Sequence, residues 1–136
     1  MNATNEGNNR EDTKATCRWK GRIWLEGTEG TFLGFGRIVL LERIEEFGSI
    51  SKAARSMEMS YKHAWDLVAS MNRQAATPLI RTASGGKGGG GTRLTEAGRE
   101  AVELFRGSHD RLREFLEKET NDLLNALGTD LQPPPE

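Results

Sequence analysis

The chain has 136 residues, of which 35% are hydrophobic and 29% are charged, and its formal net charge is −1 at pH 7. This length indicates one domain with, at most, a short appendage. The sequence has no run near the roughly 18 consecutive apolar residues of a membrane helix, and its polar N-terminus lacks the apolar segment of a secretory signal. The single cysteine, Cys17, excludes an intramolecular disulfide and a cysteine-rich zinc site. We therefore expect a cytoplasmic protein without a membrane partner.

Positive charge is concentrated in the middle of the chain. Residues 48–99 contain 8 Lys and Arg against 3 Asp and Glu, a net charge of +5, whereas residues 1–47 carry −1 and residues 100–136 carry −5. A localised basic segment is what a phosphate-facing surface would produce. The alternative, from charge alone, is that these cations are scattered over solvated faces.

The N-terminal part is predicted to contain one short strand. Residues 1–16 are rich in Asn, Glu and Thr and have little to bury, so we expect disorder there. From Cys17 to Leu25, apolar and polar residues alternate, which is the period of a half-buried strand. Several glycines between residues 27 and 36 then predict a passage rich in turns.

Two helices are predicted between residues 35 and 57. Apolar residues recur at helical spacing from about Phe35 to Phe47. Gly48 is suited to end this helix, because glycine adopts the left-handed conformation without a Cβ penalty. Ser49 is an N-cap candidate for a second helix over about Ile50–Met57.

A third helix is predicted from Tyr61 to about Asn72 or Arg73, with Ser60 as its N-cap candidate. Because only about three residues separate it from the second helix, the two must cross steeply, as in a helix-turn-helix. Its core-facing side is predicted to be Ala64, Leu67, Val68 and Met71. The opposite side is predicted to be Tyr61, Lys62, Trp65, Ala69 and Asn72.

Two short strand signals, Leu79–Thr82 and Thr92–Leu94, flank the run GGKGGGG at residues 85–91. We predict a wing hairpin over residues 79–94, in which glycines let the backbone approach a sugar-phosphate chain and Lys87 supplies charge. The alternative is a merely flexible hairpin loop. A nucleotide site is not favoured, because no helix begins at the glycines and Gly88 stands where a P-loop has Ser or Thr.

A long helix is predicted from Thr95, its cap, to about Leu127. A helix of about 30 residues is too long to be covered by so small a core, so we expect a second copy of the chain to cover it as a homodimer. The predicted dimerisation residues are Leu104, Phe105, Leu112, Phe115, Leu116 and Leu123.

The predicted site is a surface that contacts duplex DNA. Base reading in the major groove needs a helix N-terminus with hydrogen-bonding or flat apolar side chains, which the third helix offers. For Tyr61 and Trp65, the alternative is a packing role. The predicted DNA-binding residues are Ser60, Tyr61, Lys62, His63 and Trp65 on this helix, Ser49 and Ser51 at the start of the second, and Arg81, Lys87 and Arg93 of the wing. The two histidines are about 46 positions apart and no metal-ligand cluster is visible, so we expect neither an enzyme nor a metal site.

Five short blocks together resemble a known family: GSISKAA (48–54), MSYKHAWD (59–66), MN (71–72), GGKGGGG (85–91) and LT (94–95). In this order and spacing they are similar to the DNA-binding domain of ModE-type molybdate-responsive regulators, within a frame that looks like the LysR-type winged helix. The resemblance covers roughly residues 18–127. It implies a mainly α (α+β) winged helix-turn-helix with a long C-terminal dimerisation helix. It also implies a homodimer that binds a pseudo-palindromic operator near genes of molybdate uptake or molybdenum metabolism.

The sequence departs from this family at its end. Family members continue into molybdate-binding domains, whereas this sequence ends at Glu136 after a proline-rich tail. We therefore expect no cofactor; molybdate sensing is either absent or belongs to a separate molybdate-sensing protein.

The expected domains are a disordered tail (1–16), a winged helix-turn-helix (17–98), the continuation of the dimerisation helix (99–128) and a second disordered tail (129–136). The competing function is a protein-interaction module that dimerises with another regulator without binding DNA itself. That alternative predicts no salt-dependent binding to DNA.

Overall fold

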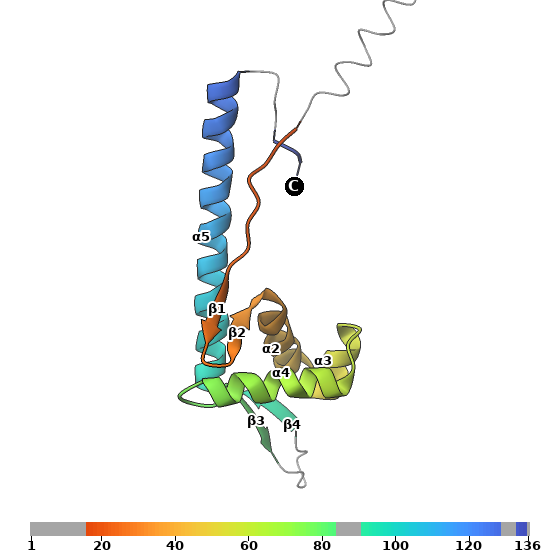
Figure 1. Cartoon of the computed structure of the whole chain (residues 1–136). Helices are drawn as coiled ribbons and strands as arrows, with labels where there is room; N and C mark the ends of the chain where they lie inside the picture. The colour runs from red at the N-terminus through yellow and green to blue at the C-terminus, as the bar shows by residue number, and fades with distance from the viewer. Residues whose placement is uncertain (1–15, 84–90, 129–132, 136) are drawn as a thin grey trace, which may run out of the picture. The chain divides into compact units, whose positions relative to one another are not determined.

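The structure, a computed structural model, describes residues 16–83, 91–128 and 133–135. The chain divides into two compact units, unit 1 (Met1–Arg22 with Asp110–Glu136) and unit 2 (Ile23–His109). In chain order the elements are β1 (Trp24–Gly27), β2 (Gly30–Gly34), α2 (Phe35–Phe47), α3 (Ile50–Ser56), α4 (Tyr61–Gln74), β3 (Ile80–Ala83), β4 (Gly91–Leu94) and α5 (Glu96–Leu127) (Figure 1). None of the helices in the described parts of the chain has the length and apolar character needed to cross a membrane.

The N-terminal strand begins later than its pattern predicts. Strand β1 pairs with β2 as an antiparallel hairpin, from Trp24 opposite Gly34 to Gly27 opposite Gly30. The prediction of a strand over Cys17–Leu25 is therefore wrong for residues 17–23, which belong to no strand. In unit 1, the backbone N–H of Trp19 donates instead to Thr120 Oγ1, at 2.8 Å.

Two further expectations for this region are also wrong. Leu25 is 52% exposed, so the face of β1 on which it lies is not a buried one. The glycine passage is not all turn, since β2 occupies most of it. Gly30 has φ 95°, which allows the tight turn between the strands.

The three helices of the helix-turn-helix lie where they are predicted, within one or two residues. Gly48 ends α2 in the left-handed conformation, with φ 66°, and its N–H donates to Ile44 O at 2.7 Å. Figure 1 shows α2, α3 and α4 grouped within unit 2, with the β3–β4 hairpin extending from them.

The core of unit 2 lies between these helices, the β3–β4 hairpin and the first part of α5. Three alanines are almost completely buried: Ala53 and Ala54 of α3 and Ala64 of α4. Their small side chains let the two helices approach closely. The predicted core side of α4 is confirmed. The largest fully buried apolar side chains are Ile38, Leu40, Leu41, Ile44 and Met71.

The long helix α5 begins directly after Thr95, its predicted N-cap. Thr95 Oγ1 accepts a hydrogen bond from Gly98 N at 3.0 Å. Of the predicted dimerisation residues, Phe105 is 7% exposed and belongs to the core of unit 2, whereas Leu104 and Phe115 are 62% and 56% exposed. In unit 1, Thr120 and Leu124 are the buried residues of this helix.

Candidate nucleic-acid interface

The turn between α3 and α4 is fixed by backbone hydrogen bonds. The N–H groups of Met57 and Met59 donate to Ala54 O, both at 3.0 Å, and close the end of α3. Glu58 has φ 56°, a left-handed conformation that costs a non-glycine residue about 1–2 kcal/mol. The left-handed conformation of Glu58 changes the direction of the chain, so that α4 does not continue along the axis of α3.

Serine side chains hold the first turns of both helices. Ser60 Oγ accepts a hydrogen bond from His63 N at 3.0 Å, and Ser49 Oγ accepts one from Lys52 N at 3.1 Å. Both serines were predicted to contact DNA; within the chain they act as N-caps, and their hydroxyl groups keep a proton to donate. Ser51 is exposed on α3.

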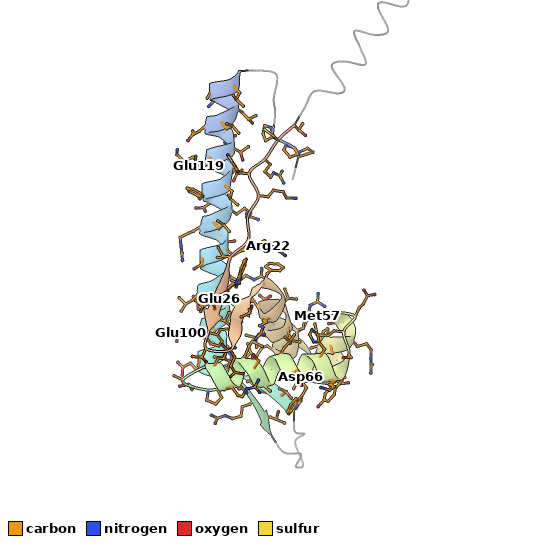
Figure 2. The ribbon with its side chains drawn as sticks, viewed as in Figure 1. Arg22, Glu26, Met57, Asp66, Glu100 and Glu119 are labelled. Carbon is orange, nitrogen blue, oxygen red and sulfur yellow. The ribbon has the colours of Figure 1, made fainter. Side chains whose placement is uncertain are left out.

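The outward face of α4 carries large side chains that the core does not use. Tyr61 is 56% exposed and Trp65 is 52% exposed, so their alternative role as packing residues is not supported. Lys62 Nζ lies 3.0 Å from Asp66 Oδ2, and both side chains are more than half exposed. Figure 2 labels Asp66 on α4. Such a surface pair contributes little to stability, so the ammonium group can exchange the carboxylate for a phosphate or a base at low cost.

The wing presents two arginines side by side. In the β3–β4 ladder Arg81 lies directly opposite Arg93, and both are exposed. The other face of this hairpin is turned inward, where Thr92 is only 6% exposed. Like charges directly opposite each other on a sheet destabilise it, and within the described residues neither guanidinium has an ion-pair partner. An anion shared by the two would remove this repulsion. Lys87, predicted for the wing tip, lies outside the described residues.

Strand β4 is attached to the C-terminal end of α2. The N–H of Thr92 donates to Gly48 O at 3.0 Å, and the N–H of Leu94 donates to Glu45 Oε2 at 3.1 Å. A Cβ at Gly91 would lie 3.0 Å from Gly48 O. The close approach of these two backbones therefore explains why residue 91, the last of the run GGKGGGG, is a glycine.

The C-terminal half of α4 is fixed by residues that the sequence did not indicate. Gln74 Nε2 donates to Thr31 O at 3.0 Å, and Arg37 Nη1 donates to Ser70 Oγ at 3.0 Å. Burial lowers the pKa of Arg37 from its usual value, although a guanidinium stays protonated in proteins. Asn72, predicted for the exposed side of α4, is half-buried and binds the backbone at residues 79 and 80.

The structure thus places all the described DNA-binding candidates in unit 2, on α3, α4 and the wing. Among the residues that the structure describes, no group of three or more His, Cys, Asp or Glu is arranged to hold a metal ion. The fold and the exposed helix define the class: unit 2 is a winged helix-turn-helix.

Comparison with known proteins agrees with this class. The model of the family described as "Bacterial regulatory helix-turn-helix protein, lysR family" matches residues 35–99, which extend from the start of α2 to the first turn of α5. This is a family of regulators and not of enzymes.

Several curated proteins are similar to the chain. "Molybdenum transport protein ModE" of Azotobacter vinelandii is 40% identical over 115 residues, which are 85% of this chain and 43% of that protein. "Molybdenum-pterin-binding protein MopB" of Rhodobacter capsulatus is 46% identical over 83 residues, 61% of this chain and 30% of that protein. "DNA-binding transcriptional dual regulator ModE" of Escherichia coli K12 is 45% identical over 69 residues, 51% of this chain and 26% of that protein.

These matches support a DNA-binding domain of the ModE type in the helix-turn-helix part of the chain. The chain spans less than half the length of these relatives.

Proposed function

We propose that the chain is a transcriptional regulator that binds a specific duplex operator through α4 and the β3–β4 wing. The observation that carries the proposal is the outward face of α4, where Tyr61 and Trp65, in the first two turns after the N-cap, are more than half exposed. A helix that packs on one face and leaves aromatic side chains exposed on the other is suited to insertion into the major groove.

The proposed contacts divide into base reading and phosphate binding. Tyr61, Lys62 and Trp65 face the base edges, and His63 lies beside them at the start of α4. Arg81 and Arg93 bind the sugar-phosphate chain, because their mutual repulsion is relieved there. Lys87 adds a phosphate contact at the wing tip, and Ser49, Ser51 and Ser60 offer hydroxyl donors.

We further propose that the chain binds its operator as a homodimer. Leu104 and Phe115 on α5 are large, apolar and mostly exposed, whereas Leu112, Leu116 and Leu123 are half-buried. In unit 2, a groove of about 540 Å³ lined by Trp24, Leu25 and Leu104 adds apolar surface, with Glu100 also at its wall. Within either unit, exposed apolar surface of this kind is a candidate interface. A two-fold dimer requires two half-sites related by symmetry, and hence a pseudo-palindromic operator.

The proposed targets are genes of molybdenum transport or metabolism. The support for this step is sequence similarity to relatives whose names refer to molybdenum transport and to transcriptional regulation. A controlling molybdate signal, or a separate protein that senses molybdate, remains part of the proposal.

The experiment is fluorescence-anisotropy titration of a duplex with the operator of the Escherichia coli ModE regulator, against a scrambled duplex of equal composition. It is run at several salt concentrations, with and without molybdate. We expect tighter binding to the operator and a steep decrease in affinity with salt, because phosphate contacts release counterions. Absence of salt-dependent binding to either duplex would support the interaction module instead.

A further inference from the structure

We propose that Asn72 is a positioning residue that sets the wing at the distance from the recognition helix that DNA requires. This inference rests on the proposed function. Asn72 lies in the last part of α4, and its side chain makes three hydrogen bonds to the chain segment that leads into the wing. Oδ1 accepts from Leu79 N at 2.9 Å and from Ile80 N at 3.2 Å, and Nδ2 donates to Ile80 O at 3.0 Å.

These bonds hold the first rung of the wing. Ile80 is the first residue of β3, and one amide side chain fixes both its N–H and its C=O. The next residue is Arg81, which faces Arg93 across the ladder. Trp65 lies two turns before Asn72 on the same rigid helix, a separation of roughly 10 Å at 1.5 Å per residue. Asn72 therefore joins the proposed base-reading and phosphate-binding surfaces.

The other described attachments of the wing lead to different helices. Strand β4 is bound to α2 through Thr92 N and Gly48 O, and the segment before β3 is bound to the start of α5 through Thr95 N and Leu79 O, at 2.9 Å. Loss of the Asn72 side chain leaves these attachments in place. The hairpin then stays folded, while its position relative to α4 is released.

An asparagine side chain is suited to this role, whereas aspartate and alanine are not. An amide offers both an acceptor and a donor, and Asn72 uses both toward the backbone. Aspartate keeps the acceptor for the two N–H groups but sets a carboxylate oxygen against Ile80 O. Alanine removes all three bonds.

The matched control is Gln74, an amide on the same helix that anchors the other hairpin. Gln74 Nε2 donates to Thr31 O at 3.0 Å, and its Oε1 accepts from Glu29 N at 3.3 Å. Gln74→Ala thus removes a comparable set of bonds without touching the wing. It separates a general loss of stability from a specific loss of wing placement.

The experiment measures the salt dependence of operator binding for wild type, Asn72→Ala and Gln74→Ala, each alone and combined with Arg81→Ala/Arg93→Ala. Each lost phosphate contact reduces the slope of log K against log salt by about 0.9. We expect Asn72→Ala to reduce the slope by about 1–2, and the arginine substitutions to cost roughly tenfold or more in affinity in wild type but much less after Asn72→Ala. Gln74→Ala is expected to keep the wild-type slope and the full arginine effect.

The outcomes separate the two proposals. If the wild-type protein binds neither duplex, the proposed function fails. If it binds the operator and Asn72→Ala keeps both the slope and the arginine effect, the positioning role is refuted. If Asn72→Ala shows no cooperative unfolding transition, Asn72→Asp is used in the same series; a slope and an arginine effect equal to those of wild type would refute the role there too.

Discussion

Gly98→Ala is expected to destabilise the protein, although the same change in a helix ordinarily stabilises it. Gly98 lies in the first turn of α5, where a Cβ would lie 2.1 Å from Leu79 O and 3.1 Å from the carbonyl carbon. This carbonyl cannot turn away freely, because it accepts a hydrogen bond from Thr95 N at 2.9 Å. The approach of the loop to the helix therefore requires glycine.

The size of the effect follows from three contributions. Overpacking of this kind costs typically 1–3 kcal/mol, and loss of the Leu79–Thr95 hydrogen bond costs about 1 kcal/mol. Alanine regains about 1 kcal/mol of helix propensity. The expected net loss is about 2 kcal/mol, a decrease in Tm of roughly 8–16 °C for a domain of the size of unit 2 (Ile23–His109).

Gly36→Ala is the matched control. Gly36 lies in the first turn of α2, and a Cβ there would meet no atom within 4 Å. We expect this change to raise stability by about 0.5 kcal/mol. Thermal unfolding followed by circular dichroism compares the two variants. A Tm of Gly98→Ala equal to or above that of Gly36→Ala would refute the reasoning.

Three further predictions concern the interface, the turn and the dimer. Lys62→Ala should weaken operator binding and change Tm by no more than about one or two degrees, since exposed ion pairs contribute little to stability. The control is Lys118→Ala, which breaks a similar pair with an aspartate on α5. This control should leave the affinity for the operator unchanged in the same titration. Glu58→Gly should raise the free energy of unfolding in urea by up to about 1 kcal/mol, because glycine adopts φ 56° without strain; a decrease would show that the Glu58 side chain stabilises the turn. Leu104→Glu with Phe115→Glu should give monomers by analytical ultracentrifugation and a lower Tm than wild type, because dimerisation stabilises the folded state; a persistent dimer would place the interface elsewhere.

The helices could be predicted because their signals are local. The apolar repeat of α2 and the glycine after it define both ends of the helix, and Ser49 and Ser60 mark the starts of the next two helices by a side chain that bonds within its own turn. Such patterns depend on neighbours a few residues away, which the sequence shows directly.

The errors concern partners that are distant in the chain. Alternation at residues 17–23 indicates an extended segment but does not show that its backbone binds Thr120, about a hundred residues later. Neighbouring Leu104 and Phe105 differ because only one of them faces the core of unit 2. The sequence pattern assigns Asn72 to the exposed face of the helix, because its hydrogen-bond partner, the backbone of a later loop, is not visible in that pattern.

Fluorine NMR of fluorotryptophan-labelled protein tests the central claim, that the exposed face of α4 contacts DNA, most directly. The chain has three tryptophans, and Trp65 and Trp19 are equally exposed, at 52%. Resonances are assigned in the free protein with single Trp→Phe variants, and saturation with the operator duplex is verified by anisotropy. We predict that the operator shifts the Trp65 resonance and removes its solvent isotope effect, while the Trp19 resonance stays unchanged. An unchanged Trp65 resonance in the saturated complex would contradict the assignment of α4 as the recognition helix.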